Sequence, residues 1–128
     1  DCDTQRNLNF EGINQSKKIG NYFVKNDINI EKIYSSEWCR CKDTALHAFQ
    51  KYETFDALNS FYDQKFYKNK NRQVKELKSF IKKWNNSGNI ILVTHYVVIM
   101  ELLNISSESG EIIISNKNYE VISRKTIK

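Results

Sequence analysis

Four consecutive apolar residues, Ile90-Ile91-Leu92-Val93, constrain the fold more than any other part of this 128-residue sequence. A strand with apolar side chains at every position is typical of a strand covered on both faces, and such strands occur in parallel sheets with helices on either side. Thr94 and His95 follow directly, and residues 96–103 then form an apolar segment suited to a short helix. We therefore expect a strand that leads into a helix, which is the repeating unit of α/β proteins.

The remaining segments fit the same architecture. The sequence predicts helices at residues 10–26, 38–51 and 72–84, a strand within residues 28–35, an irregular aromatic-rich stretch at 52–68, and an edge hairpin formed by 111–115 and 119–123. This order predicts one domain, residues 1–128, with a three-layer α/β/α arrangement around a mostly parallel sheet. Such domains usually open with a strand, and this chain opens with a helix. We therefore expect that the first, central strand is missing from the 128 residues and that the domain is incomplete at its N-terminus.

The first helix carries its own packing signal. Asn9 can cap it, and Ile13, Ser16, Gly20, Phe23 and Val24 share one face at the helical period. Small residues at positions 16 and 20 would allow this helix to lie close to the sheet.

Composition limits the classes of partner. The net charge of +5 comes from lysines scattered among asparagines and isoleucines, which indicates a solvated surface; the alternative is a field that attracts anions. No apolar run approaches the roughly 20 residues of a membrane-spanning helix, so no membrane span is expected. A basic nucleic-acid-binding module is a weak alternative, because no aromatic-basic motif supports it.

Three cysteines, Cys2, Cys39 and Cys41, bear on the compartment. Cys-x-Cys is poor zinc spacing and no second Cys or His pair follows, so no metal site is expected. The cysteines are either free thiols in a reducing cell or include a disulfide from Cys2 to Cys39 or Cys41 in an oxidising compartment. We expect Cys2 to lie close to one of the other two.

Two strand ends carry the candidate chemistry. Ser35 and Ser36 end one strand, and Arg40 lies in the first turn of the next helix, where backbone N–H groups and the helix dipole favour an anion. The alternative is an ordinary turn with serine caps and a surface arginine. His95 follows the other strand, where it could donate a hydrogen bond to a phosphoryl oxygen or act as a nucleophile, or simply be a satisfied polar residue. Because parallel strands end at one edge of a sheet, Arg40 and His95 should converge near the Ser35-Ser36 turn.

Several segments have the spacing of known motifs. Residues 6–12, Arg-Asn-Leu-Asn-Phe-Glu-Gly, precede Gln15; Ser35-Ser36 precede Arg40 and then Thr44-Ala45; Thr94-His95 ends the apolar strand; and Gly110-Glu111-Ile112 opens the hairpin. The first three resemble, in order, the motifs Leu-Thr-x-x-Gly-x-x-Gln-Ala, Ser-Ser-x-x-x-Arg-x-x-x-Thr-Ala and Thr-His-Gly. These belong to the histidine phosphatase superfamily, the phosphoglycerate mutase-like and phosphohistidine phosphatase-like enzymes, and the resemblance covers almost the whole chain.

The resemblance implies a phosphatase that uses no metal and no cofactor. A first-strand Arg-His-Gly motif supplies the nucleophilic histidine in this superfamily, Arg40 would hold the phosphoryl oxygens, and His95 would help to stabilise the transferred group. Ser36, Arg6 and Tyr96 would contribute to substrate binding. The expected partner is a small phosphorylated substrate or a phosphoprotein. The words Thr-Gln-Arg-Asn-Leu and Trp-Cys-Arg-Cys resemble a bacterial subgroup with many secreted members, which together with the cysteines favours a periplasmic or secreted location over the cytoplasm.

The chain departs from the superfamily pattern in three places. The Arg-His-Gly motif is missing, and Tyr96 replaces the usual glycine. From residue 58, where mutase-like members place a glutamate proton donor, the chain has no carboxylate until Asp63. Asp63 or Glu101 could replace that donor, and a leaving group such as phosphohistidine would need little protonation. We predict a phosphatase that hydrolyses a phosphomonoester or phosphoramidate, with its nucleophile upstream of Asp1. The alternative is an inactive, phosphate-binding relic. Without the first strand, the site should show an open gap and no turnover of p-nitrophenyl phosphate.

Overall fold

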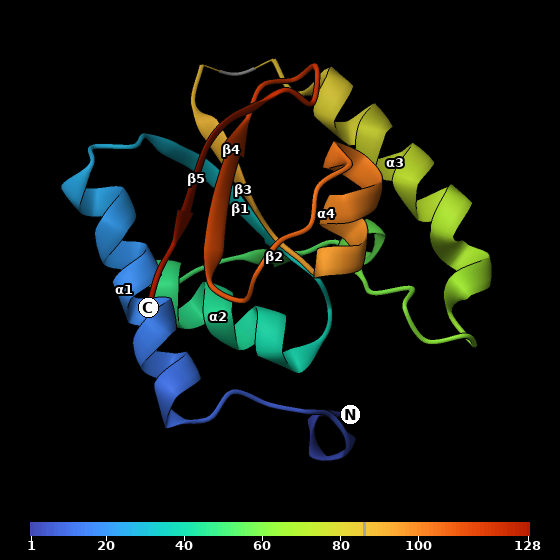
Figure 1. The fold of residues 1–128 in the computed structure, drawn as a ribbon, viewed down its shortest axis with the longest axis horizontal. Coiled ribbons are helices and arrows are strands. Elements are labelled where there is room, and N and C mark those ends of the chain that lie inside the picture. The colour runs from blue at the N-terminus through green and yellow to red at the C-terminus, as the bar shows by residue number, and fades with distance from the viewer. Residues whose placement is uncertain (86) are drawn as a thin grey trace.

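A computed structural model describes residues 1–85 and 87–128, and Figure 1 shows its arrangement. Single 3-10 turns lie at Cys2–Thr4, Asp56–Leu58 and Tyr67–Asn69. The helices are α1 (Phe10–Lys25), α2 (Cys39–Phe49), α3 (Lys70–Lys83) and α4 (Tyr96–Leu103), and the strands are β1 (Ile30–Ser35), β2 (Glu53–Thr54), β3 (Asn89–Val93), β4 (Glu111–Ser115) and β5 (Val121–Thr126).

The parallel sheet has the strand order β2-β1-β3. Ser35 of β1 lies opposite Thr54 of β2 on one side and opposite Val93 of β3 on the other. The ladder extends one residue further, because the Ser36 N–H donates to the Val93 carbonyl at 2.9 Å. The strands therefore end together, and the residues that follow β1 and β3 meet at one edge of the sheet.

Helices cover the sheet on both sides, which confirms the predicted three-layer α/β/α class. One apolar cluster includes Leu58, Leu77 and Val98 and packs against Leu92 of β3. The other includes Phe23 of α1 and Ile112 of β4 and packs against Ile91 of β3. Adjacent β3 side chains thus face opposite layers, as the strand period requires.

The inward face of α1 differs from the prediction. Ser16, Gly20 and Phe23 are buried, but Val24 is 78% exposed. The small residue Gly20 allows a close approach to α2 and not to the sheet: a Cβ atom at Gly20 would overlap the Ala48 carbonyl of α2. The helical period predicted Val24 on the packed face, four residues after Gly20, but the contact with α2 leaves its side chain in solvent.

The second edge of β3 and the hairpin also differ. The hairpin is not an edge of the parallel sheet but a separate two-stranded sheet, β4-β5. Among the described residues, no strand pairs with the second edge of β3, so its apolar residues are only half-buried. The second hairpin strand begins at Val121 because the turn extends to Tyr119, which has a positive φ of 65°.

Helix and strand ends otherwise fall within about two residues of the predicted bounds, with two exceptions. β5 ends at Thr126, three residues beyond the predicted end, and the short strand β2 lies inside the stretch expected to be irregular. None of the described helices has the length and apolarity needed to cross a membrane.

Candidate functional site

Arg40 and His95 meet at the edge where β1 and β3 end. Arg40 is the second residue of α2, and His95 immediately precedes α4. The Arg40 Nη2 atom lies 3.3 Å from the His95 Nδ1 atom, although 55 positions separate the two residues. Their expected convergence is confirmed.

Ser36 completes the contact on the other side of the His95 ring. Its side chain is fully buried, and its Oγ atom lies 2.9 Å from the His95 Nε2 atom. The same hydroxyl oxygen accepts the Trp38 N–H at 3.1 Å and lies 3.1 Å from the Asn59 Oδ1 atom. The Ser36 hydroxyl therefore forms hydrogen bonds to three parts of the site: the β1–α2 turn, His95 and the loop after the Asp56–Leu58 turn.

The environment of His95 favours a neutral imidazole. The residue is only 6% exposed, and burial, followed by the positive charge of Arg40, lowers the pKa of His95 from 6.5 to about 4. The Trp38 ring covers the same pair: its centroid lies 5.1 Å from the His95 ring and 5.3 Å from the Arg40 guanidinium carbon. Arg40 thus supplies the positive charge of this cluster, and His95 supplies neutral hydrogen-bonding atoms.

Sequence reasoning missed two members of the cluster, Asn59 and Cys41. Cys41 is buried, and its Sγ atom lies 3.6 Å from His95 Nε2. Burial raises the pKa of Cys41 to about 11, so it remains a thiol at neutral pH. The position of Cys41, one helix residue beyond Arg40, was its only available signal. Asn59 lies in the segment where a carboxylate was sought.

The N-terminal segment is fastened to the start of α2. A disulfide joins Cys2 to Cys39, with Cα atoms 5.6 Å apart, which confirms the expected proximity of Cys2 to one of the other cysteines. The Cys39 N–H donates to Gln5 Oε1 at 2.8 Å. The residue before Arg40 is therefore held by both a covalent bond and a hydrogen bond.

Three other candidate residues lie outside this cluster of contacts. Arg6 is exposed on the segment that contains Gln5. Tyr96 follows His95, is 50% exposed, and has its ring 5.9 Å from that of Tyr62. Asp63 is exposed and accepts the Lys65 N–H. Across residues 1–85 and 87–128, no hydrogen bond or ion pair joins Arg6, Tyr96 or Asp63 to Arg40 or His95.

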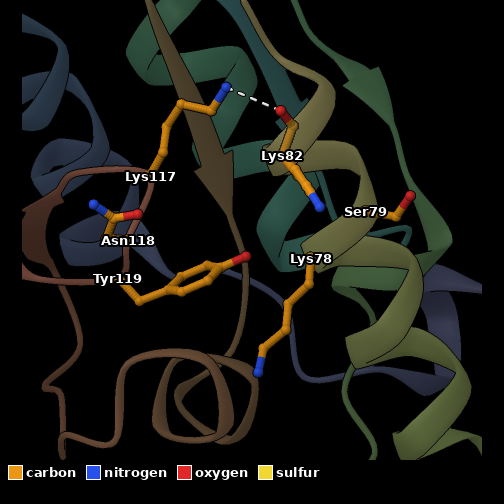
Figure 2. Close-up of a pocket in the computed structure, with 6 residues that line it drawn as sticks. All are labelled: Lys78, Ser79, Lys82, Lys117, Asn118 and Tyr119. Atoms are coloured by element: carbon orange, nitrogen blue, oxygen red, sulfur yellow. Dashed lines mark hydrogen bonds between the residues drawn. The ribbon is translucent and has the colours of Figure 1, made fainter.

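The open gap expected beside the site stays a prediction, because both of the described cavities lie elsewhere. Arg40 and His95 touch each other, and two cavities lie elsewhere. The larger, about 530 Å³, lies between α3 and the hairpin turn (Figure 2). The smaller, about 170 Å³, lies among α1, β1 and α2. In the part of the chain that the structure describes, no group of three or more His, Cys, Asp or Glu side chains could hold a metal ion.

Comparison with known proteins identifies the fold. No family model matches the sequence, and no curated protein matches it. Solved structures do match: a phosphoglycerate mutase from Thermus thermophilus has a TM-score of 0.70 at 15% identity, over 98% of this chain and 87% of that chain. The protein TTHB049 from the same organism has a TM-score of 0.67 at 15% identity, over 97% and 87%. The protein histidine phosphatase SixA, complexed with tungstate, has a TM-score of 0.68 at 14% identity, over 94% and 84%. The arrangement of strands and helices around Arg40 and His95 is thus the fold that this phosphoglycerate mutase and this protein histidine phosphatase share.

Proposed function

We propose that this chain is a phosphatase domain that hydrolyses a phosphomonoester or a phosphoramidate through a phosphohistidine intermediate. The observation that carries the proposal is the contact of Arg40, His95 and Ser36 at the edge where the parallel strands end. The fold neighbours support it, since one is a phosphoglycerate mutase and another is a protein histidine phosphatase.

Arg40 is the proposed phosphate-binding residue. A guanidinium group can form two parallel hydrogen bonds to phosphoryl oxygens and retains its charge at all relevant pH values. Arg40 is only partly buried and lies in the first turn of α2, where the helix dipole adds to the attraction for an anion. A phosphate would replace the contact between Arg40 and His95 and draw both side chains toward itself.

The nucleophile is proposed to come from a strand upstream of Asp1 that ends in Arg-His-Gly. Its imidazole nitrogen attacks phosphorus, the bond from phosphorus to the leaving oxygen or nitrogen breaks, and the leaving group takes a proton. Water then attacks the phosphohistidine, the P–N bond breaks, and inorganic phosphate leaves as histidine is regenerated. The second edge of β3, unpaired among the described residues, supports this proposal because a strand added there would end beside His95.

The proton donor and substrate remain part of the proposal. Asp63 is exposed, and Glu101 forms an ion pair with Lys70 at 3.2 Å, so neither is held against His95 by a contact in the described chain. A phosphoramidate such as phosphohistidine, whose leaving group needs little protonation, suits this arrangement. Small phosphorylated molecules and phosphoproteins are both proposed substrates. The Cys2–Cys39 disulfide supports an oxidising compartment.

An inactive phosphate-binding relic is the second candidate, because the chain has two histidines and only His95 lies at a strand end. The test compares the 128-residue protein with a version that begins upstream, at the natural start of the gene. We expect the 128 residues to bind phosphate without hydrolysing p-nitrophenyl phosphate, and the longer protein to turn it over. If the longer protein also lacks turnover, the relic is favoured. Turnover by the 128 residues alone would mean that His95 is the nucleophile.

A further inference from the structure

Asn59 has its side-chain orientation fixed by the backbone. The residue follows the Asp56–Leu58 turn, and its Oδ1 atom accepts the Glu37 N–H at 2.8 Å. Its Nδ2 atom donates to Glu37 Oε1 at 2.9 Å. Because a backbone amide can only donate, the atom that faces Glu37 N must be the oxygen. The second contact, to a carboxylate that accepts, requires the same orientation.

This orientation determines what the Ser36 hydroxyl does. The Ser36 Oγ atom lies 3.1 Å from Asn59 Oδ1, which can only accept, so the single hydroxyl hydrogen of Ser36 points to Asn59. The Trp38 N–H already donates to the same Oγ atom. Ser36 has no hydrogen left for His95 and must accept from it. The His95 Nε2 atom, 2.9 Å away, therefore carries the ring proton.

The other side of the ring leads independently to the same assignment. Arg40 Nη2 lies 3.3 Å from His95 Nδ1, and a guanidinium group can only donate. Nδ1 must therefore present its lone pair. The Ser36 oxygen that accepts at Nε2 and the Arg40 group that donates at Nδ1 therefore favour the same tautomer of a neutral, buried imidazole.

We propose that Asn59 is a positioning residue that acts through Ser36 to hold His95 in the tautomer protonated at Nε2, with the Nδ1 lone pair facing Arg40. The functional part of this proposal rests on the proposed phosphate site. An oxyanion that replaces the Arg40 contact at Nδ1 has no hydrogen to accept there. Either the anion must bring a hydrogen, or Nδ1 must take up a proton when the anion binds.

Proton uptake makes the affinity for an anion depend on pH with a definite sign. Sulfate is the useful probe, because it carries no hydrogen at neutral pH. If each bound sulfate requires one proton at Nδ1, its affinity falls by up to about tenfold for each unit that the pH rises above the pKa of His95. The other titratable groups near the ring are Arg40 and Cys41 of α2, which contact it, and Glu37 of the β1–α2 turn, which reaches it through Asn59. Arg40 keeps its proton, Cys41 stays a thiol because burial raises its pKa to about 11, and the Glu37 carboxylate accepts from Asn59.

The first test is the nitrogen NMR spectrum of the histidine rings in the ¹⁵N-labelled 128-residue protein. We expect a protonated Nε2 and an unprotonated Nδ1 for His95 at neutral pH. In Asn59→Ala, the Ser36 hydroxyl is free to donate to Nε2, and only the partly buried Arg40 still favours a lone pair at Nδ1. The spectrum should therefore shift toward the tautomer protonated at Nδ1. Asn26→Ala is the matched control, since it removes an exposed asparagine whose amide donates to the Tyr22 carbonyl. A His95 ring protonated at Nδ1 in the wild-type protein would overturn the proposal without any variant.

The second test is sulfate titration across about pH 6 to 8. The wild-type protein and Asn26→Ala should lose affinity steeply as the pH rises, and Asn59→Ala should show a much flatter dependence, because Nδ1–H can then donate directly. Asn59→Asp combined with Glu37→Gln keeps an acceptor facing Ser36 and should restore the wild-type slope. A change in overall folding alone would not flatten the slope and then recover it in this way.

Two further outcomes separate this proposal from the proposed function. If Asn59→Ala does not fold, the spectrum of the wild-type protein still tests the proposal, because a His95 ring protonated at Nδ1 would overturn it. An Asn59→Ala protein with the wild-type spectrum and the wild-type slope would overturn the positioning role. If sulfate and phosphate fail to bind to the wild-type protein, the proposed phosphate site is wrong, and the ring spectrum still decides the role of Asn59.

Discussion

The two ends of the parallel sheet offer an anion very different surroundings. At one end, Arg40 is the cation that contacts His95, within a buried set of hydrogen bonds. At the other end, the cavity between α3 and the hairpin turn is lined by Lys78, Lys82 and Lys117 and by no acidic residue (Figure 2). Counting charges would favour the lysine cavity.

The lysines, however, are not organised around a ligand. The Lys117 Nζ atom donates to the carbonyls of Lys82 and Trp84 at the C-terminal end of α3, and the Lys78 Nζ atom lies 5.6 Å from the centre of the Tyr119 ring. Figure 2 shows these side chains reaching the cavity from two elements, with the Lys117 contact to Lys82 drawn as a dashed line. Lysine is a flexible, strongly hydrated point charge, whereas arginine has a fixed fork of donors. The comparison teaches that fixed geometry, more than net charge, distinguishes the candidate site.

The largest expected effect concerns the disulfide beside the candidate site. Reduction of Cys2–Cys39 by a dithiol opens a loop with a sequence separation of 37 residues and should lower the free energy of unfolding, by about 4 kcal/mol in the chain-entropy model. Urea unfolding with and without the dithiol measures this change. Cys2→Ser should show the same loss, with no further effect of the dithiol. Equal stability of the oxidised and reduced proteins would show that the start of α2 is rigid without the covalent bond.

The next effect is a dependence of stability on pH that arises in the candidate site. The pKa of His95 is about 4 in the folded protein and 6.5 ordinarily, so between these values the unfolded chain binds more protons. The contribution of neutral His95 to the free energy of unfolding is therefore complete above about pH 6.5. It is lost as the pH falls toward 4, and its upper limit is on the order of 3 kcal/mol. Urea unfolding at a series of pH values measures it. His95→Gln should flatten this slope relative to His47→Gln; identical slopes in the two variants would refute the burial argument.

Removal of Arg40 should show which end of the sheet binds the anion. Arg40→Ala is expected to lower the affinity for phosphate or vanadate by about 10- to 100-fold, because charge-assisted hydrogen bonds are lost. The double variant Lys78→Ala/Lys82→Ala removes two cations from the lysine cavity and should change the affinity by less than about twofold. Titration calorimetry measures both. A larger loss in the lysine variant would place the anion at the other end of the molecule.

The smallest expected effect belongs to Lys117. Its contact with the last carbonyls of α3 places a cation where the helix dipole is negative, so Lys117→Ala should lower the free energy of unfolding by about 0.5–1 kcal/mol. The phosphate affinity should not change. Thermal unfolding measures the first quantity and titration the second. A loss of phosphate affinity would show that the lysine cavity and the candidate site are coupled.

Sequence patterns predicted those parts of the fold that local chemistry determines. The apolar run in β3, the Asn9 cap and the serines after β1 each carry their own signal, and parallel topology alone requires Arg40 and His95 to meet. The strand β2 was not predicted, because it consists of two exposed residues, Glu53 and Thr54, with no apolar period.

Contacts between residues far apart in the sequence are the part of the candidate site that could not be predicted. The Asn59 amide bridges 22 positions to the Glu37 N–H, and Cys41 Sγ approaches His95 across 54. Neither residue type predicts a contact with a distant residue, because asparagine is common in loops and a buried cysteine usually packs as a small apolar side chain. The separation of the hairpin from the parallel sheet likewise depends on strand pairing, which alternating polarity in the sequence does not encode.

The second edge of β3 has a consequence for how this protein behaves at high concentration. Among the described residues, its backbone N–H and C=O groups face no partner strand, and an apolar strand with such an edge is a template for another chain. Molecules with this edge unpaired can either remain monomeric or join edge to edge, and the second route becomes more frequent as the concentration rises. The short length of β3 and the polar Asn89 at its start limit the size of that template. Solubility is therefore a property that depends on whether this edge of β3 has a partner.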